Sequence, residues 1–316
     1  MLKVYAATIA IVILFGVNIF LTVVNSREVT LNDSISFRSL QISDQAQDEQ
    51  AYILPISGPN YIPILDSNIQ KPLIGAKSAI IYDTGSSRFL YERNLEIKLP
   101  IASLTKILSA VVALEKLNLD DIATISESSI RVDGEKQDLY LGEKLSVRNL
   151  LKLMLIESSN DAAYALANYA EEKRLDFTGE MNLKAKALNM RDSFFNDPAG
   201  LDDSAYSTAQ DLVKLVEYSL NYKEIWDISA EKTAIIESSD ERIKHSIKST
   251  NRLLGLIKDI IGGKTGYTDG ALECMILVAS VPDYPGQLIS IVLGSDDRFG
   301  DTQKLVEWTR AAYRWK

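Results

Sequence analysis

The chain has 316 residues, with 34 Lys and Arg against 43 Asp and Glu, and a formal net charge of −9. This acidic balance argues against nucleic acid as the main partner, because a phosphate backbone needs basic surface. A single cysteine, Cys274, excludes an internal disulfide and a thiolate-rich zinc site, and a single histidine, His245, argues against a multi-histidine metal centre. We therefore expect no metal and no cofactor, and an enzyme of this composition would use a base other than histidine.

The amino-terminal 25 residues contain an apolar run from Val4 to Val24 that is preceded by Lys3. A helix of about 21 residues at ~1.5 Å per residue is roughly 31 Å long, which matches the hydrocarbon core of a bilayer. Residues 1–25 are therefore predicted to form a single transmembrane helix in the cytoplasmic membrane, with the remaining chain extracytoplasmic. A signal peptide cleaved near Ser26 is the alternative, and it would export the same residues.

Residues 26–75 are predicted to be an extracytoplasmic linker. They show no sustained helical or strand period, and positions 32–50 are rich in Ser, Asp and Gln. Four prolines between 55 and 72 favour an extended segment that can lie against a folded domain.

Residues 76–316 are predicted to form the compact domain. Strands are expected at 78–82, 88–91, 260–264, 272–280 and 288–294, because these stretches are apolar and bounded by turn residues. Helices are expected from Ile107 to Leu117 and at 145–156, 161–170, 181–188, 208–220 and 302–315. This order predicts one α/β sandwich with a helical subdomain.

The first candidate for chemistry is Ser103-Leu104-Thr105-Lys106. Positions i and i+3 share one face of a helix, so the hydroxyl of Ser103 and the amine of Lys106 can come within hydrogen-bond reach. A serine needs a neighbour that takes its proton, and lysine can do this only when it is neutral. The apolar residues after Lys106 are consistent with the burial that would lower its pKa.

Two sets of such motifs occur in the sequence. The first contains Ser103-x-x-Lys106, Ser158-x-Asn160 and Lys264-Thr265-Gly266, with whole elements between the motifs. The second crowds Ser229-x-x-Lys232 and Ser249-x-Asn251 into the residues before the same Lys264, and the segment after Lys232 is polar. That segment offers no buried helix to lower a lysine pKa, so we assign the chemistry to the first set.

The first set resembles the signature of the penicillin-recognising serine enzymes. Its flanks narrow the resemblance to the low-molecular-mass D-alanyl-D-alanine carboxypeptidases of the S11 peptidase family, and the similarity runs from about Ala76 to the carboxyl terminus. The flanking sequences that carry it are Pro100-Ile101-Ala102-Ser103, Ser159-Asn160-Asp161-Ala162-Ala163, Tyr206-Ser207-Thr208-Ala209 and Gly263-Lys264-Thr265-Gly266-Tyr267-Thr268. The resemblance implies a β-lactamase/transpeptidase-like fold, in which helices flank an antiparallel sheet beside a helical subdomain.

The resemblance also implies roles for the catalytic residues. Ser103 would be the acylated nucleophile and Lys106 its general base. Ser158 would pass a proton to the leaving amine, and Asn160 would contact Lys106 or the substrate amide.

A second group of residues is implied to bind substrate. Lys264 would raise the local positive potential, Thr265 would bind the terminal carboxylate of the substrate, and Gly266 would let the substrate backbone approach closely. The amides of Ser103 and Tyr267 would form the oxyanion hole. Arg298 would assist carboxylate binding, and its alternative is a surface ion pair.

These roles imply a serine D,D-carboxypeptidase that removes the terminal D-alanine from peptidoglycan stem peptides through an acyl-enzyme on Ser103. Its partners would be a stem peptide ending in D-Ala-D-Ala, β-lactams as covalent ligands, and the membrane through the amino-terminal helix. Many family members carry a further β-rich domain and a carboxyl-terminal anchor. Here the chain stops at Lys316, so we expect the amino-terminal segment to do the anchoring.

Two other functions remain as alternatives. A class A β-lactamase would need a glutamate in an E-x-x-L-N context after the Ser-x-Asn motif, and none follows Asn160. A non-catalytic anchored protein could keep the fold, although the complete set of signature residues argues against it.

Other polar and aromatic residues receive structural interpretations. His245 lies in a polar segment and is expected to be exposed, Cys274 is expected to be a small buried residue, and Trp308 and Trp315 are expected to pack from one helix. Asp161 can be a first-turn helix charge without a chemical role.

Overall fold

The computed structural model describes residues 61–131 and 139–316, and its central feature is a five-stranded sheet. The strand order is β3-β2-β10-β9-β8, and every neighbouring pair is antiparallel. The five strands predicted from the sequence are confirmed, and each is longer than predicted. Their bounds are β2 (Ser78–Asp83), β3 (Arg88–Arg93), β8 (Ile260–Thr268), β9 (Leu272–Val281) and β10 (Tyr284–Ser295).

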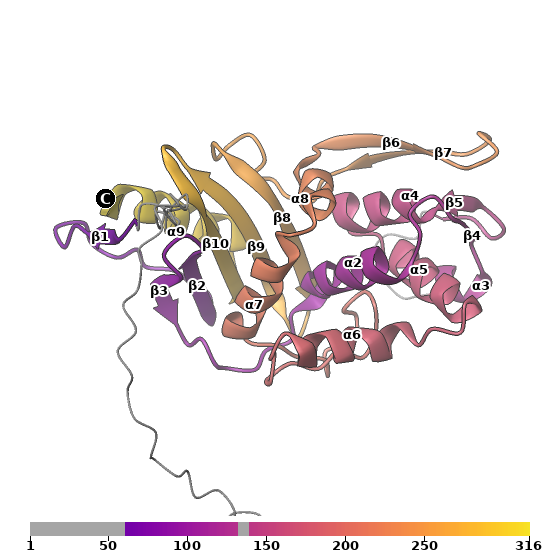
Figure 1. Ribbon diagram of the computed structural model, residues 1–316, viewed down its shortest axis with the longest axis horizontal. Coiled ribbons are helices and arrows are strands. Elements are labelled where there is room, and N and C mark those ends of the chain that lie inside the picture. Colours follow the sequence, from indigo (N-terminus) through magenta and orange to yellow (C-terminus); the bar gives the residue numbers. More distant parts are fainter. Residues whose placement is uncertain (1–60, 132–138) are drawn as a thin grey trace, which may run out of the picture. The chain divides into compact units, whose positions relative to one another are not determined.

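Helices cover both faces of this sheet (Figure 1). Met275 and Leu277 of β9 pack in one core with the last helix, α9 (Arg298–Ala312). Ile276 and Val278 point to the opposite face and join the larger core of the helical subdomain. Because side chains alternate between the faces of a strand, a sheet covered on both sides needs apolar residues at successive positions. The single cysteine, Cys274, is fully buried in this strand, as predicted.

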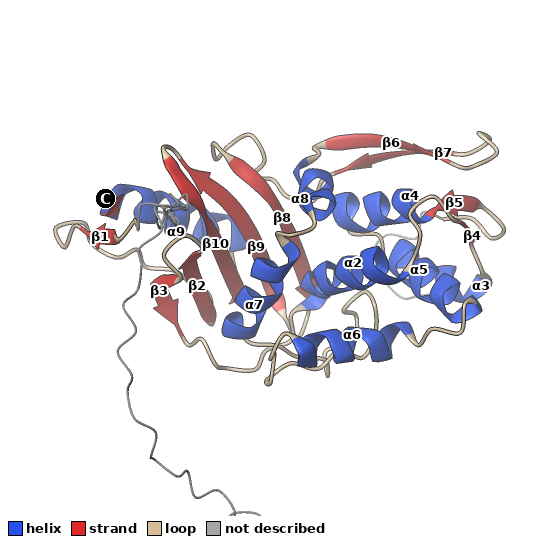
Figure 2. Cartoon of the chain, in the orientation of Figure 1, coloured by secondary structure: helices blue, strands red, loops and turns tan. Residues whose placement is uncertain are grey.

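The helical subdomain lies beyond the β8 edge of the sheet (Figure 2). Its central helix α2 is buried from its first residue to Ala113. All the helices predicted from hydrophobic periodicity are present, although their first and last residues differ from the prediction. The 145–156 region differs most from the prediction, because it divides into a strand, an α-helix and a π-helix. The bounds are α2 (Thr105–Lys116), α3 (Glu127–Ile130), α4 (Val147–Lys152), η2 (Leu153–Glu157), α5 (Asn160–Glu172), α6 (Phe177–Ala187), α7 (Ala209–Ser219) and α8 (Lys223–Ala230).

Two small antiparallel pairs complete the subdomain and were not predicted. They are β4 (Ile122–Thr124) with β5 (Lys144–Ser146), and β6 (Thr233–Glu237) with β7 (Lys244–Lys248).

The expectation that His245 is exposed is wrong. It is 8% exposed, and its Nε2 lies 2.7 Å from Oε1 of Glu143. The reason is strand alternation, because His245 stands opposite Ile236 on the covered face of the β6–β7 hairpin. The exposed charges beside it in sequence belong to the other face and to the turn.

The closing helix was also predicted too long at its carboxyl end. Helix α9 stops at Ala312, and β11 (Tyr313–Trp315) then pairs antiparallel with β1 (Pro63–Leu65). The indole Nε1 of Trp315 donates to Asp83 at 3.0 Å, and the hydroxyl of Tyr313 donates to the backbone of β3 at 2.9 Å. These bonds and the β1 partner favour extended backbone where helical spacing suggested more helix, so Trp315 packs from a strand.

The predicted transmembrane helix and most of the predicted linker lie outside the described residues. Within residues 61–131 and 139–316, no helix is long and apolar enough to cross a membrane.

Candidate active site

Ser103 lies in a 3-10 turn, η1 (Ala102–Leu104), that leads directly into α2. The Nζ of Lys106 lies 2.7 Å from the Oγ of Ser103, so the structure brings the two residues together as their spacing predicts. Ala102 has a positive φ of 49°, which costs energy for a residue with a side chain. The strained residue lies directly before the candidate nucleophile, and the residues packed around it hold its backbone in this conformation.

Lys106 is fully buried and has three polar neighbours. Besides Ser103, its Nζ donates to Oδ1 of Asn160 at 2.8 Å and to the carbonyl of Ala199 at 2.9 Å. Burial lowers its pKa from 10.5 to about 7, although the negative charge of Asp197 opposes this shift. A neutral amine can donate to Asn160 and Ala199 and still offer its lone pair to the hydroxyl of Ser103.

Ser158 and Asn160 occupy the junction between two helices. The π-helix η2 ends at Glu157, and Ser158 follows it in the left-handed conformation with φ 70°. Ser159 caps α5 through its hydroxyl, which accepts from the amide of Ala162 at 3.2 Å. Asn160 is therefore the first residue of α5. Short π-helices frequently occur at functional sites, and this one delivers Ser158 to the cleft.

Lys264 reaches the site from the other side, on β8. Its ammonium donates to Oγ of Ser158 at 2.7 Å and to the carbonyl of Thr265 at 2.8 Å. The lysine is 1% exposed. The site thus contains two serine–lysine pairs, Ser103 with Lys106 and Ser158 with Lys264.

Gly266 is where β8 meets the nucleophile turn. A Cβ on Gly266 would lie 2.9 Å from the carbonyl oxygen of Ile101 and 3.0 Å from the amide nitrogen of Ser103. Such distances are too short for a side chain, so this approach requires glycine. The close approach of Gly266 brings the adjoining backbone of Tyr267 near the amide of Ser103. An oxyanion hole made of these two amides needs that arrangement.

Ser103, Ser158, Asn160 and Gly266 line a cleft of about 360 Å³, and the buried Lys106 and Lys264 each donate to one of its two serines. Tyr267 is 57% exposed at its rim, and the guanidinium of Arg298 donates to the carbonyl of Gly266 at 2.8 Å. Arg298 is therefore bound to the strand that carries Lys264, and it lines the cleft. The lining residues are Ser103, Ser158, Asn160, Leu201, Thr250, Thr265, Gly266, Tyr267, Thr268, Asp269 and Arg298.

Sequence reasoning missed Thr250, which it placed in the rejected second set. Its Oγ1 lies 2.6 Å from Oγ1 of Thr265, and its amide donates to the carbonyl of Ile156 at 3.1 Å. The rest of that set stays outside the cleft lining. Ser229 is buried in α8 and donates to the carbonyl of Trp226 at 3.1 Å.

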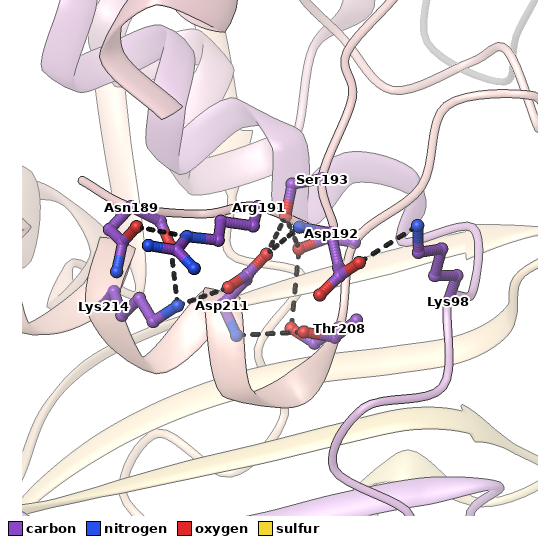
Figure 3. Close-up of polar contacts among 9 residues, drawn as sticks. Lys98, Asn189, Arg191, Asp192, Ser193, Thr208, Asp211 and Lys214 are labelled. Carbon is purple, nitrogen blue, oxygen red and sulfur yellow. Dashed lines mark hydrogen bonds and ion pairs between the residues drawn. The ribbon is translucent and has the colours of Figure 1, made fainter. Parts of the chain in front are cut away.

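The segment before the nucleophile is held by a polar network around Asp211 (Figure 3). Leu99, four residues before Ser103, exchanges two backbone hydrogen bonds of 3.0 Å with Ser207. The Oγ of Ser207 lies 2.8 Å from that of Ser193, which donates to the Asp211 carboxylate at 2.9 Å. This network gives the motif that includes Ser207 a structural role in placing the nucleophile turn.

Comparisons with known proteins agree with this geometry. A family model described as D-alanyl-D-alanine carboxypeptidase, Peptidase S11, matches residues 66–297. The D-alanyl-D-alanine carboxypeptidase DacF of Bacillus subtilis is 29% identical over 75% of this chain and 63% of its own length. A D-alanyl-D-alanine endopeptidase of Pseudomonas aeruginosa is 33% identical over 74% of this chain and 77% of its own length. The crystal structure of the Streptomyces K15 DD-transpeptidase superposes with a TM-score of 0.71 at 28% identity, over 77% of this chain and 100% of that one.

Proposed function

Because the chain belongs to the S11 peptidase family of D-alanyl-D-alanine carboxypeptidases, we propose that it removes the terminal D-alanine from peptidoglycan stem peptides as a serine hydrolase. The observation that carries the proposal is the contact chain from Ser103 through Lys106 to Asn160 in the cleft. A buried amine with a pKa near neutrality beside a serine hydroxyl is an arrangement that activates the hydroxyl as a nucleophile.

In the acylation step, the amine of Lys106 takes the hydroxyl proton as Oγ of Ser103 attacks the carbonyl carbon of the penultimate D-alanine. The carbonyl electrons move to the oxygen, where the amides of Ser103 and Tyr267 stabilise the charge. The electrons on the oxygen re-form the carbonyl as the C–N bond breaks, and Ser158 relays the proton that Lys106 took to the leaving amine of D-alanine, which leaves Lys106 neutral again. Water subsequently attacks the ester, which releases the shortened peptide and restores the serine.

Positive charge and strand geometry support a substrate with a free carboxylate. Lys264 lies beside Ser158 and Arg298 lies over β8, while the net charge of the whole chain is −9. Strand β8 is an edge of the sheet, and an edge strand can pair with an extended peptide. A β-lactam presents an amide and a carboxylate in the same relation, so we expect it to acylate Ser103.

Release of D-alanine from a purified muropeptide with a pentapeptide stem tests the proposal. We expect stoichiometric D-alanine and tetrapeptide product, together with a stable covalent adduct of a fluorescent penicillin. No adduct on the folded protein would indicate a non-catalytic member, and rapid hydrolysis of the penicillin would indicate a β-lactamase.

A second candidate activity is cleavage of cross-links between stem peptides. Relatives from Pseudomonas aeruginosa and Escherichia coli are named D-alanyl-D-alanine endopeptidases, and the match covers 77% and 78% of their lengths. The same acyl-enzyme would form, but the leaving amine would belong to a neighbouring stem. Incubation with cross-linked muropeptide dimers distinguishes the two activities, because only an endopeptidase converts dimers to monomers.

We place the protein in the cytoplasmic membrane, with residues 1–25 as a single-pass anchor and the catalytic domain extracytoplasmic. The apolar run from Val4 to Val24 supports this proposal, and so does a substrate found outside the membrane. Fractionation of cells that produce the full chain tests it. Anchoring leaves the protein in the membrane fraction at full length, whereas cleavage near Ser26 releases a shorter form.

Gly266→Ala is expected to slow acylation by a fluorescent penicillin by about 10–100-fold, because the added methyl would separate β8 from the amide of Ser103. The measurement is the second-order labelling rate, with thermal unfolding to show that the variant folds. Gly75→Ala is the matched control, since its Cβ would meet Asp301 at an ordinary 3.6 Å. A folded Gly266→Ala variant with the normal rate would contradict the close-approach argument.

Thr250→Val is expected to raise KM for a D-Ala-D-Ala peptide by about 3–10-fold with a smaller change in kcat, because it removes the hydroxyl that positions Thr265. Steady-state D-alanine release measures both constants. Thr250→Ser keeps the hydroxyl and should behave like the wild type. Equal KM values for the valine and serine variants would rule out a role for this hydrogen bond.

A further inference from the structure

The loop after α6 carries a buried carboxylate, Asp197, that collects successive backbone amides. It accepts from the amides of Ala199 at 2.7 Å, Gly200 at 2.6 Å, Leu201 at 3.0 and 3.2 Å, and Asp202 at 3.0 Å. The side chain is 8% exposed. Four amides on one carboxylate fix the path of residues 199–202, because hydrogen bonds to a carboxylate are stronger than those between neutral groups.

This loop touches the lysine base and the nucleophile turn. The carbonyl of Ala199 accepts from Nζ of Lys106 at 2.9 Å. A Cβ on Gly200 would lie 2.0 Å from the carbonyl oxygen of Ala102, so the loop is in direct contact with the residue before Ser103. A displacement of the loop would therefore move the Ala199 carbonyl that accepts from Lys106. It would also loosen the strained turn at Ala102.

The charge of Asp197 also acts on Lys106. It opposes the effect of burial on the pKa of the lysine, and it adds to the effect of burial in raising the pKa of Tyr164 on α5, which stays neutral. Three other buried charged residues lie on elements of the site, namely Lys264, Asp161 and Glu157 at the end of η2, and each has partners of its own. Lys264 on β8 donates to Ser158, and Asp161 on α5 accepts from the backbone of Leu139 at 3.4 Å.

We infer that Asp197 is a positioning residue for the lysine base. Its carboxylate folds residues 199–202 so that the Ala199 carbonyl holds Nζ of Lys106 against the hydroxyl of Ser103. Its negative charge limits how far burial can favour the neutral amine. This inference rests on the proposed serine-hydrolase function of the same site.

Asp197→Asn tests both effects, because it keeps the side-chain shape and removes the charge. The amide group also places an NH₂ against backbone donors, so the loop loosens. We expect acylation by a fluorescent penicillin at pH 8 to fall by about 10–100-fold. We expect the acidic limb of the pH–rate profile to move to lower pH by roughly 0.5–1 unit, because loss of a nearby negative charge lowers the pKa of a lysine.

Two variants control for a purely structural effect. Asp83→Asn alters another buried carboxylate, one that accepts from Tyr284 at 2.8 Å and from Trp315 at 3.0 Å at the carboxyl-terminal end of the fold. It should lower the melting temperature without moving the limb. Asp197→Glu keeps the charge, so its limb should stay near the wild-type position even if its rate falls. An unmoved limb in folded Asp197→Asn, or the same shift in Asp83→Asn, would overturn the inference.

A titration of Lys106 separates this inference from the proposed function. NMR of ¹³Cε-labelled lysine, with the Lys106 signal assigned by its loss in Lys106→Met, reports the pKa without any substrate. A lower value in Asp197→Asn than in the wild type supports the inference even if the protein releases no D-alanine, and equal values reject it. Failure of D-alanine release by the wild type would reject the function alone.

Discussion

Replacing Ser103 with alanine is expected to abolish covalent labelling by a fluorescent penicillin and to lower D-alanine release by at least about 10³-fold. The hydroxyl is the atom that would form the acyl bond, and Lys106 lies 2.7 Å from it. Removing one oxygen leaves the cleft and the buried lysine in place. The expected loss is therefore chemical, with unchanged thermal unfolding, and mass spectrometry of the intact protein after incubation with penicillin measures the adduct directly.

The second Ser-x-x-Lys copy provides a control within the same chain. Ser229 is buried in α8 and donates to the carbonyl of Trp226, away from the residues that line the cleft. Ser229→Ala should therefore keep both labelling and D-alanine release. Labelling that persists in Ser103→Ala, or disappears in Ser229→Ala, would show that the nucleophile has been assigned to the wrong motif.

Local patterns predicted most of the elements. Strands β2, β9 and β10 contain apolar runs, and the helices α2, α5 and α7 repeat apolar residues at helical spacing, so ten to fifteen residues of sequence are enough to predict each of them. The β6–β7 hairpin does not, because only one of its faces is covered and its strands have five residues each. The burial of His245 depends on that hairpin and on Glu143, which lies 102 positions away.

Some residues of the candidate site were likewise predictable from local sequence and others were not. The fold gathers the residues placed by motif in and directly around one cleft, because Ser103, Ser158 and Lys264 each stand at an element boundary or on an edge strand. Thr250 and Asp197 could not be found from the sequence. The amide of Thr250 donates to the distant carbonyl of Ile156, and the loop that Asp197 folds reaches Lys106, 93 positions before Ala199, so neither role carries a local signal that distinguishes it from that of an ordinary turn residue.

Replacing Lys106 with methionine is expected to lower the acylation rate by at least about 10³-fold, because it removes the amine that lies 2.7 Å from the hydroxyl of Ser103 and takes its proton in the proposed mechanism. In the wild type, burial lowers the lysine pKa from 10.5 to about 7. The fraction of neutral amine therefore rises as the pH passes through 7, and the acylation rate should rise with it. Stopped-flow labelling between pH 5.5 and 9 measures this limb.

The same shift predicts a change in stability. An unfolded Lys106 titrates near 10.5 and the folded one near 7, so the unfolded chain binds more protons between these pH values. The contribution of this group to the free energy of unfolding thus rises with pH, by about 1.4 kcal/mol per unit across that window. Lys106→Met removes the contribution, so the difference in unfolding free energy between wild type and variant should depend on pH from 7 to 10.

Lys232→Met is the matched control, since Lys232 completes the second Ser-x-x-Lys copy and lies outside the cleft lining. Lys232→Met should leave the labelling rate and its pH dependence as in the wild type.

Lys106→Arg tests the assignment further, because a guanidinium keeps the positive charge but cannot accept a proton from Ser103 at any pH of the experiment. If the arginine variant acylates at the normal rate, Lys106 acts through its charge alone. If it is inactive while Lys232→Met is active, Lys106 must be neutral to act, which is what a general base requires.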